Sequence, residues 1–159
     1  MKWLTDVEQT AWLGLLVTFA GLDQALDRQL QRDSGMSHAT YAVLAALSSG
    51  RDGARHMSEL AGIAGYSQSR LSHAVNRLEH DGLIRRTNCP QDRRAVHAVL
   101  TERGRAVIDK AAPGHVAAVR ALVFDRLTAE QTAALAEITE TIYAGLVDDG
   151  LASALPAPD

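Results

Sequence analysis

The sequence predicts a mainly helical protein that contains one small antiparallel β-hairpin. Long stretches at both ends of the 159-residue chain carry apolar residues at helical spacing, and 47% of all residues are hydrophobic. Between these stretches, two β-type runs over residues 83–87 and 95–100 flank the turn-forming segment NCPQDRR. The length fits one core of ordinary size, or a small domain with appended helices, and two independent domains are not expected.

The first helix is expected over residues 5–32. Its main apolar stripe repeats at helical spacing and consists of Leu15, Phe19, Leu22, Leu26 and Leu30. A second apolar set widens the stripe: Trp12, Leu13, Leu16 and Val17. One face packs on the rest of the chain, so we expect the additional surface, with Trp3, to meet a partner subunit; a wide core face in a monomer is the alternative.

Two short helices are expected next. Ser37 is a suitable N-cap for a helix over residues 38–47, whose inward residues are Tyr41, Leu44, Ala45 and Leu47. After a short polar link, Ser58 can cap a third helix with Glu59 in its first turn, and with Leu60 and Ile63 buried. Gly65 ends that helix.

A fourth helix is expected to start at Ser67 and to pack inward through Leu71, Val75 and Leu78. A short helix, a tight turn with glycine and a second helix form a helix-turn-helix, whose second helix enters the major groove of DNA. Asp81-Gly82 ends the fourth helix, with Leu83 as the hydrophobic partner of that glycine cap.

The outward face of the fourth helix is rich in short or forked hydrogen-bonding groups. Such side chains pair with base edges and phosphates, although a solvated face without function is the alternative. The hairpin that follows has an arginine tip, Arg93 and Arg94, and would be a basic wing for a minor groove or the backbone. The predicted DNA-facing residues are Ser67, Gln68, Ser69, Arg70, Ser72, His73, Asn76, Arg77, Arg93 and Arg94.

The charge distribution favours one DNA-facing module within an acidic chain. The formal net charge is −3, but residues 51–100 carry +3 and the remaining residues carry −6. A phosphate backbone would therefore be attracted to one part of the protein and repelled by the rest.

The C-terminal third is expected to be helical. Thr101 begins a helix to about residue 112, Pro113-Gly114 kinks or breaks it, and it resumes over residues 115–127. Thr128 and Gln131 form a capping box before a stripe of Leu135, Ile138, Ile142 and Leu146. The expected organisation is an N-terminal dimerisation helix (1–34), a DNA-binding module (37–100), C-terminal dimerisation helices (101–149) and a flexible tail (150–159).

These motifs resemble the MarR (multiple antibiotic resistance regulator) family of bacterial winged helix-turn-helix transcription factors. The resemblance covers nearly the whole chain and is carried by MSELA, SRLSHAVNRLEHDGLIRR and PQDRRAVHAVLTERG, most specifically by Asp92, Arg93 and Arg94. It implies a homodimer with interlocked terminal helices, a palindromic DNA operator, repression of transcription, and a small-molecule effector. It also makes Arg94 the wing-tip contact, with Asp92 as its orienting partner.

Asp92 cannot itself favour phosphate, so we expect it to hold an arginine of the wing, Arg85, Arg86 or Arg94, by a charge-assisted hydrogen bond. His73 departs from the family, whose members often have arginine or lysine there, which predicts a weaker or pH-dependent contact. Candidate effector-pocket residues, each of which could equally be core, are Trp12, Leu16, Tyr41 and His97.

Other functional classes fit the sequence less well. The six histidines have no metal-ligand spacing, and there is no phosphate loop or GxSxG nucleophile motif, so we predict neither an enzyme nor a cofactor. No apolar run reaches membrane-span length and no secretory signal begins the chain, which predicts a cytoplasmic protein. Two alternatives stay open: a winged-helix module that binds protein, and a redox-responsive regulator using the single cysteine, Cys89.

Overall fold

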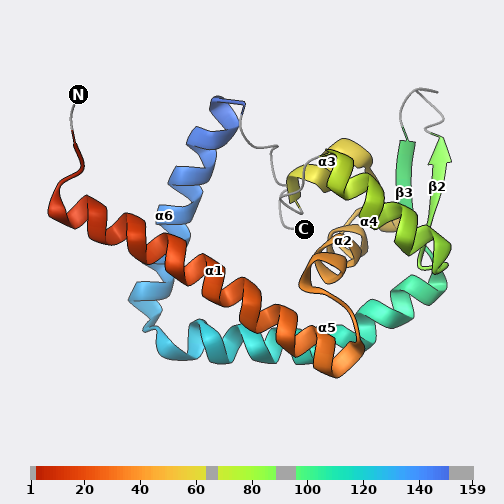
Figure 1. The fold of residues 1–159 in the computed structure, drawn as a ribbon, viewed down its shortest axis with the longest axis horizontal. Coiled ribbons are helices and arrows are strands. Elements are labelled where there is room, and N and C mark those ends of the chain that lie inside the picture. Colours follow the sequence, from red (N-terminus) through yellow and green to blue (C-terminus); the bar gives the residue numbers. More distant parts are fainter. Residues whose placement is uncertain (1–2, 64–67, 89–95, 151–159) are drawn as a thin grey trace.

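The fold is a helix-turn-helix module with a small sheet, carried on long terminal helices (Figure 1). The computed structural model describes residues 3–63, 68–88 and 96–150. Its α-helices are α1 (Asp6–Ser34), α2 (His38–Ser48), α3 (Met57–Ile63), α4 (Gln68–His80), α5 (Glu102–Leu122) and α6 (Ala129–Asp148). Its strands are β1 (Ala54–His56), β2 (Ile84–Asn88) and β3 (Val96–Leu100), and two short 3-10 helices are η1 (Arg51–Gly53) and η2 (Phe124–Arg126).

The predicted helix boundaries follow local capping chemistry. Thr5 and Glu8 form a capping box at the start of α1, and Thr128 and Gln131 form the predicted one at α6. The Ser37 hydroxyl accepts a hydrogen bond from the Thr40 amide and caps α2 as predicted. These side chains satisfy amide groups that a helix leaves unpaired at its N-terminus.

The hydrophobic core lies where α2, α3, α4 and the sheet meet, and α1 and α5 close it from one side. Its largest fully buried side chains are Leu30, Leu44, Leu47, Leu60, Leu71, Ile84, Val43 and Val75. The three residues predicted to anchor α4 are all buried, which confirms that its apolar edge faces this core.

The sheet has a third strand that the sequence did not predict. The strand order is β1-β3-β2, and all pairs are antiparallel, with Ala54 opposite Val99 and Arg86 opposite Ala98. Because β1 occupies residues 54–56 and α3 begins directly after it at Met57, Ser58 lies inside the helix, and its prediction as an N-cap is wrong. Buried Arg55 of β1 donates hydrogen bonds to the Ala46 carbonyl and the Ser49 hydroxyl at the end of α2.

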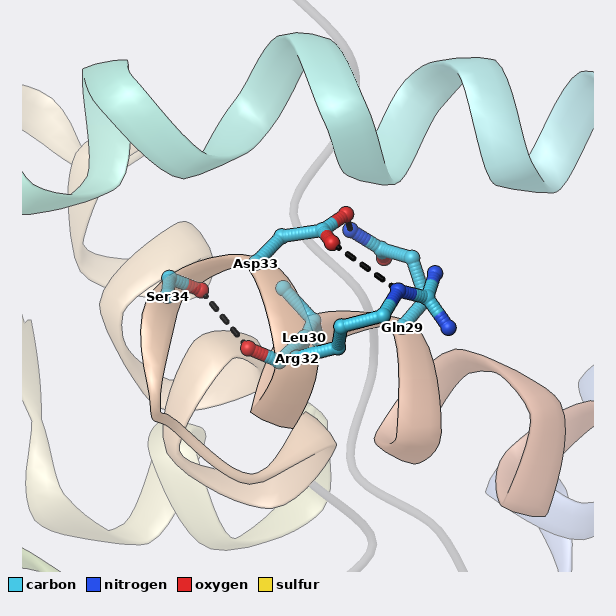
Figure 2. Close-up of polar contacts among 5 residues, drawn as sticks. All are labelled: Gln29, Leu30, Arg32, Asp33 and Ser34. Atoms are coloured by element: carbon cyan, nitrogen blue, oxygen red, sulfur yellow. Dashed lines mark hydrogen bonds and ion pairs between the residues drawn. The ribbon is translucent and has the colours of Figure 1, made fainter.

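The helix predicted to kink or break at Pro113 does not break there, because α5 continues through this residue to Leu122. A Cβ built on Gly114 would lie 3.4 Å from Nε2 of Gln29, so α5 and α1 are in contact at this point. Figure 2 shows Gln29 and Asp33 of α1 on the side of the helix that faces α5. Gln29 Nε2 donates to Asp33 Oδ2 at 2.8 Å, and the Arg32 guanidinium lies 3.2 Å from Oδ1 of Asp33. This hydrogen bond, and then the charge of Arg32, lower the pKa of Asp33.

A histidine contact joins α5 to α2 beside the C-terminal half of α1. The ring centroid of His115 lies 4.1 Å from that of Tyr41 and 5.6 Å from that of His38. Nδ1 of His115 is enclosed without a hydrogen-bond partner among the described residues. On α1, Asp23 Oδ1 contacts Nδ1 of His38 at 2.8 Å, and Asp27 accepts from the His38 amide. Burial, and then the charge of His38, lower the pKa of His115.

We expect this contact to make folding stability depend on pH. Because the pKa of His115 is lower in the folded chain than its ordinary value of 6.5, the unfolded chain binds a proton first as the pH falls. The stabilisation that comes from neutral His115 is therefore complete above pH 6.5 and decreases as the pH falls below 6.5. His115→Phe keeps a ring against Tyr41 and removes the titration, so its free energy of unfolding should fall less on acidification, measured by urea unfolding at several pH values. His80→Gln, at an exposed position, is the control. If the free energy of unfolding of His115→Phe changed with pH as steeply as that of the wild type, the expectation would be contradicted.

Candidate nucleic-acid interface

The helix α4 is fixed along one edge and exposed along the other. Leu71 and Val75 are fully buried and Leu78 is 3% exposed, so the helix cannot rotate about its axis without removing them from the core. The polar residues fall on the opposite side of the helix because successive residues turn by about 100°. The exposed residues of this polar edge are Ser69, Ser72, His73, Asn76 and Arg77.

A glycine cap turns the chain from α4 into the wing. Gly82 has a φ of 71°, in the left-handed region that glycine adopts without steric cost. The Leu83 amide donates to the Leu78 carbonyl at 2.9 Å, and the Gly82 amide donates to the Glu79 carbonyl at 3.0 Å. These two bonds define a Schellman motif, which confirms the predicted helix end and directs the next residues into β2.

A charged network connects α4 to the base of the wing. Arg86 of β2 donates from Nη1 to Glu79 Oε2 at 3.0 Å, and its backbone amide donates to Oε1 of the same carboxylate at 3.0 Å. Its Nη2 also donates to Oδ1 of Asn76 at 2.6 Å. Both oxygens of Glu79 therefore hold the strand to the helix, and the hairpin stands beside α4 (Figure 1).

The predicted DNA-facing residues are only partly within the described structure. Five of them form the exposed polar edge defined above, and Gln68 and Arg70 lie in the first turn of α4. Arg86, one of the three arginines considered as partners of Asp92, donates hydrogen bonds to Glu79 and Asn76 of α4. The predictions for Ser67, Cys89, Asp92, Arg93 and Arg94 lie outside the described residues.

A cavity of about 740 Å³ adjoins the same helix. It lies between the end of α1, α2, α4 and α5, where His73, His80 and Arg77 of α4 and Arg103 of α5 contribute basic groups. Asp81 is the acidic residue in its lining, and Met36, Leu78 and Val107 contribute apolar surface. The arrangement fits a small anion that carries an apolar part.

None of the four predicted pocket residues lines this cavity. Trp12 and Leu16 lie on α1 and are 50% and 46% exposed, whereas Tyr41 is buried in the core. His97 lies on β3, where its Nε2 is 2.9 Å from Nε2 of His56 on β1.

Among residues 3–63, 68–88 and 96–150, no helix combines the length and the hydropathy that crossing a membrane requires. Within the same ranges, no cluster of three or more histidine, cysteine, aspartate or glutamate side chains is arranged to hold a metal ion.

Comparison with known proteins places this geometry in a family. A family model described as the MarR family matches residues 34–95. The crystal structure of Sco3205, a MarR family transcriptional regulator from Streptomyces coelicolor in complex with DNA, is 47% identical to this chain. That match covers 92% of this chain and 91% of Sco3205, with a TM-score of 0.85.

Two further solved structures support the assignment. AbsC, a MarR family transcriptional regulator from Streptomyces coelicolor, is 39% identical over 93% of this chain and 99% of its own, with a TM-score of 0.85. The transcriptional regulator BldR from Sulfolobus solfataricus is 25% identical over 89% of this chain and 99% of its own, with a TM-score of 0.74. No functionally curated sequence gave a significant match. The fold, the wing and these similarities identify the chain as a member of the MarR family of winged helix-turn-helix, DNA-binding transcriptional regulators rather than an enzyme.

Proposed function

We propose that this protein regulates transcription by binding a palindromic DNA operator as a homodimer, with α4 in the major groove and the β2–β3 wing beside it. The observation that carries the proposal is the exposed polar edge of α4, held in a fixed rotation by its buried edge and tied to the wing by Arg86. The crystallisation of Sco3205 with DNA supports it.

The homodimer is supported by apolar surface on the terminal helices. Phe19 on α1 is 74% exposed and Ile138 on α6 is 56% exposed, and they belong to extended apolar stripes. Monomeric proteins rarely expose continuous apolar surface of this extent. The exposed set on the two helices is Val7, Trp12, Leu13, Leu15, Leu16, Val17, Phe19, Leu135, Ile138, Ile142 and Leu146. Two copies related by a two-fold axis would present two α4 helices to two half-sites of inverted sequence.

The experiment that tests DNA binding is a gel shift with genomic fragments at two salt concentrations. Phosphate contacts release counterions, so affinity should fall steeply as salt rises. We expect Arg77→Ala to weaken binding and to reduce the salt slope by about one. Arg28→Ala removes the same charge from an exposed position on α1 and should leave both quantities unchanged. Absence of salt-sensitive binding by the wild-type protein would favour the alternative, a winged-helix module that binds protein.

The second part of the proposal is that the protein is a repressor whose binding to DNA is controlled by a small-molecule effector. Arg77 belongs to the exposed edge of α4 and also lines the 740 Å³ cavity, so an anion bound there would compete with DNA for the same guanidinium. We expect an aromatic carboxylate such as benzoate to weaken DNA binding, measured by gel shift at constant ionic strength. Arg103→Ala should abolish the response, because Arg103 lines the cavity from α5; an unchanged response would contradict this site.

A further inference from the structure

We propose that Arg86 orients the side-chain amide of Asn76 so that its NH₂ group is presented to DNA, with Glu79 holding Arg86 in place. Asn76 then acts mainly as a hydrogen-bond donor to acceptor atoms of the operator. This inference rests on the proposed DNA binding and specifies what one position of α4 recognises.

The orientation of the amide follows from the chemistry of its partner. A guanidinium has only donor groups, so the Asn76 atom 2.6 Å from Arg86 Nη2 must be the carbonyl oxygen Oδ1. The opposite orientation would place two donors against each other. Because Oδ1 faces Arg86, the NH₂ group on the other side of the planar amide is directed away from it, and Asn76 is exposed, which gives this group access to a ligand.

Glu79 makes this orientation persistent. Its Oε2 accepts from Nη1 of Arg86 at 3.0 Å, while its Oε1 accepts from the backbone amide of the same residue. The side chains of Arg86 and Glu79 are 30% and 38% exposed, so their ion pair contributes little to folding stability. The geometry of the pair is nevertheless fixed, because Glu79 accepts one hydrogen bond from the guanidinium and one from the backbone amide of Arg86. Glu79 and Arg86 are positioning residues, and Asn76 is the group that would touch DNA.

The consequence is a restriction on what Asn76 can recognise. An unconstrained asparagine pairs with adenine by donating to N7 and accepting from N6 through the same amide. In this protein, Oδ1 of Asn76 already accepts a hydrogen bond from the guanidinium of Arg86. An amine of adenine or cytosine would therefore have to share that oxygen with the guanidinium. Acceptors that need only a donor remain: purine N7, guanine O6, thymine O4 and phosphate oxygens.

The test begins with the free protein, so that it does not depend on finding an operator. In the wild-type full chain, the ¹⁵N order parameter of the Asn76 side-chain amide should be above that of a flexible group, roughly 0.6. Arg86→Ala should lower it. Arg85→Ala is the matched control, because Arg85 is the adjacent residue of β2 and points to the opposite face. A flexible amide in the wild type, or equal order in Arg86→Ala, overturns the proposal whether or not the protein binds DNA.

The second arm uses duplex DNA selected from a random pool by the wild-type protein. Asn76→Ala should weaken binding by about ten-fold. The same loss is expected when its acceptor is removed from the DNA: N7 by a 7-deaza purine, guanine O6 by 2-aminopurine, thymine O4 by a thymine analogue without that oxygen, or a phosphate oxygen by methylphosphonate. The matching replacement should add nothing in Asn76→Ala. Coupling to a base analogue identifies a base acceptor, and coupling to methylphosphonate identifies a phosphate. Coupling of Asn76 to removal of an adenine or cytosine amine, or to no substitution, overturns the donor role. Failure to select any DNA would refute the proposed function and leave the amide measurement to decide the orientation.

Discussion

Gly104→Ala should destabilise the protein by about 3 kcal/mol or more, a larger effect than any other single methyl group is expected to have here. Gly104 lies in the first turn of α5, and a Cβ built there would be 2.0 Å from the Leu83 carbonyl oxygen and 2.8 Å from Cδ1 of Leu100. The backbone oxygen cannot move freely, because it accepts hydrogen bonds from the amide and the hydroxyl of Thr101. The added methyl would therefore force α5 away from the start of the wing.

Urea unfolding of Gly104→Ala beside Gly21→Ala isolates this contact. Gly21 is exposed in α1 with nothing within 4 Å of a built Cβ, so alanine there should raise helix stability by up to about 1 kcal/mol. The two variants carry the same chemical change with opposite expected signs. Wild-type stability in Gly104→Ala would mean that α5 does not meet the wing as the structure describes.

Ile142→Glu should convert the proposed dimer into a monomer and lower operator affinity by about a hundred-fold or more. Ile142 lies in the apolar stripe of α6 and is 49% exposed in the single chain. In a homodimer its symmetry mate would bring a second glutamate to the same interface, and two buried, unpaired carboxylates would oppose association. Each monomer would retain one α4 and would contact one half-site, so the gain from joining two half-sites would disappear.

Sedimentation equilibrium measures the assembly state, and DNA titration measures the affinity. Glu140→Lys reverses a charge on the opposite side of α6 and should remain a dimer with near wild-type binding. If the Ile142→Glu variant remained dimeric and bound DNA with wild-type affinity, the dimer interface would lie away from the apolar stripe of α6.

Local chemistry made most helix ends predictable from the sequence. Capping depends on residues within three or four positions of each other, so Ser37, Thr128 and Gly82 were assigned correctly. The buried edge of α4 was equally readable, because its apolar residues repeat with the helical period.

Contacts between distant residues were not predictable. The three-residue strand β1 exists because Ala54 pairs with Val99, and it displaced the start predicted for α3. Pro113 was expected to kink or break a helix that continues to Leu122, and the contact of α5 with α1 beside it, at Gly114 and Gln29, has no signal in the sequence. Glu79 was missed as a positioning residue because a glutamate near the end of a helix has no pattern that distinguishes it from a solvated charge. The cavity residues come from α1, α2, α4 and α5, and no sequence spacing relates them.

Hydroxyl-radical footprinting of the wild-type protein on its selected operator tests the central proposal most directly. A homodimer with one α4 in each of two major grooves predicts two protected segments, related by inverted sequence, with centres one helical turn of about 10 base pairs apart or a multiple of it. Protection should weaken as salt increases. One protected segment without an inverted partner, or no protection at any salt concentration, would contradict DNA recognition by a dimer through α4.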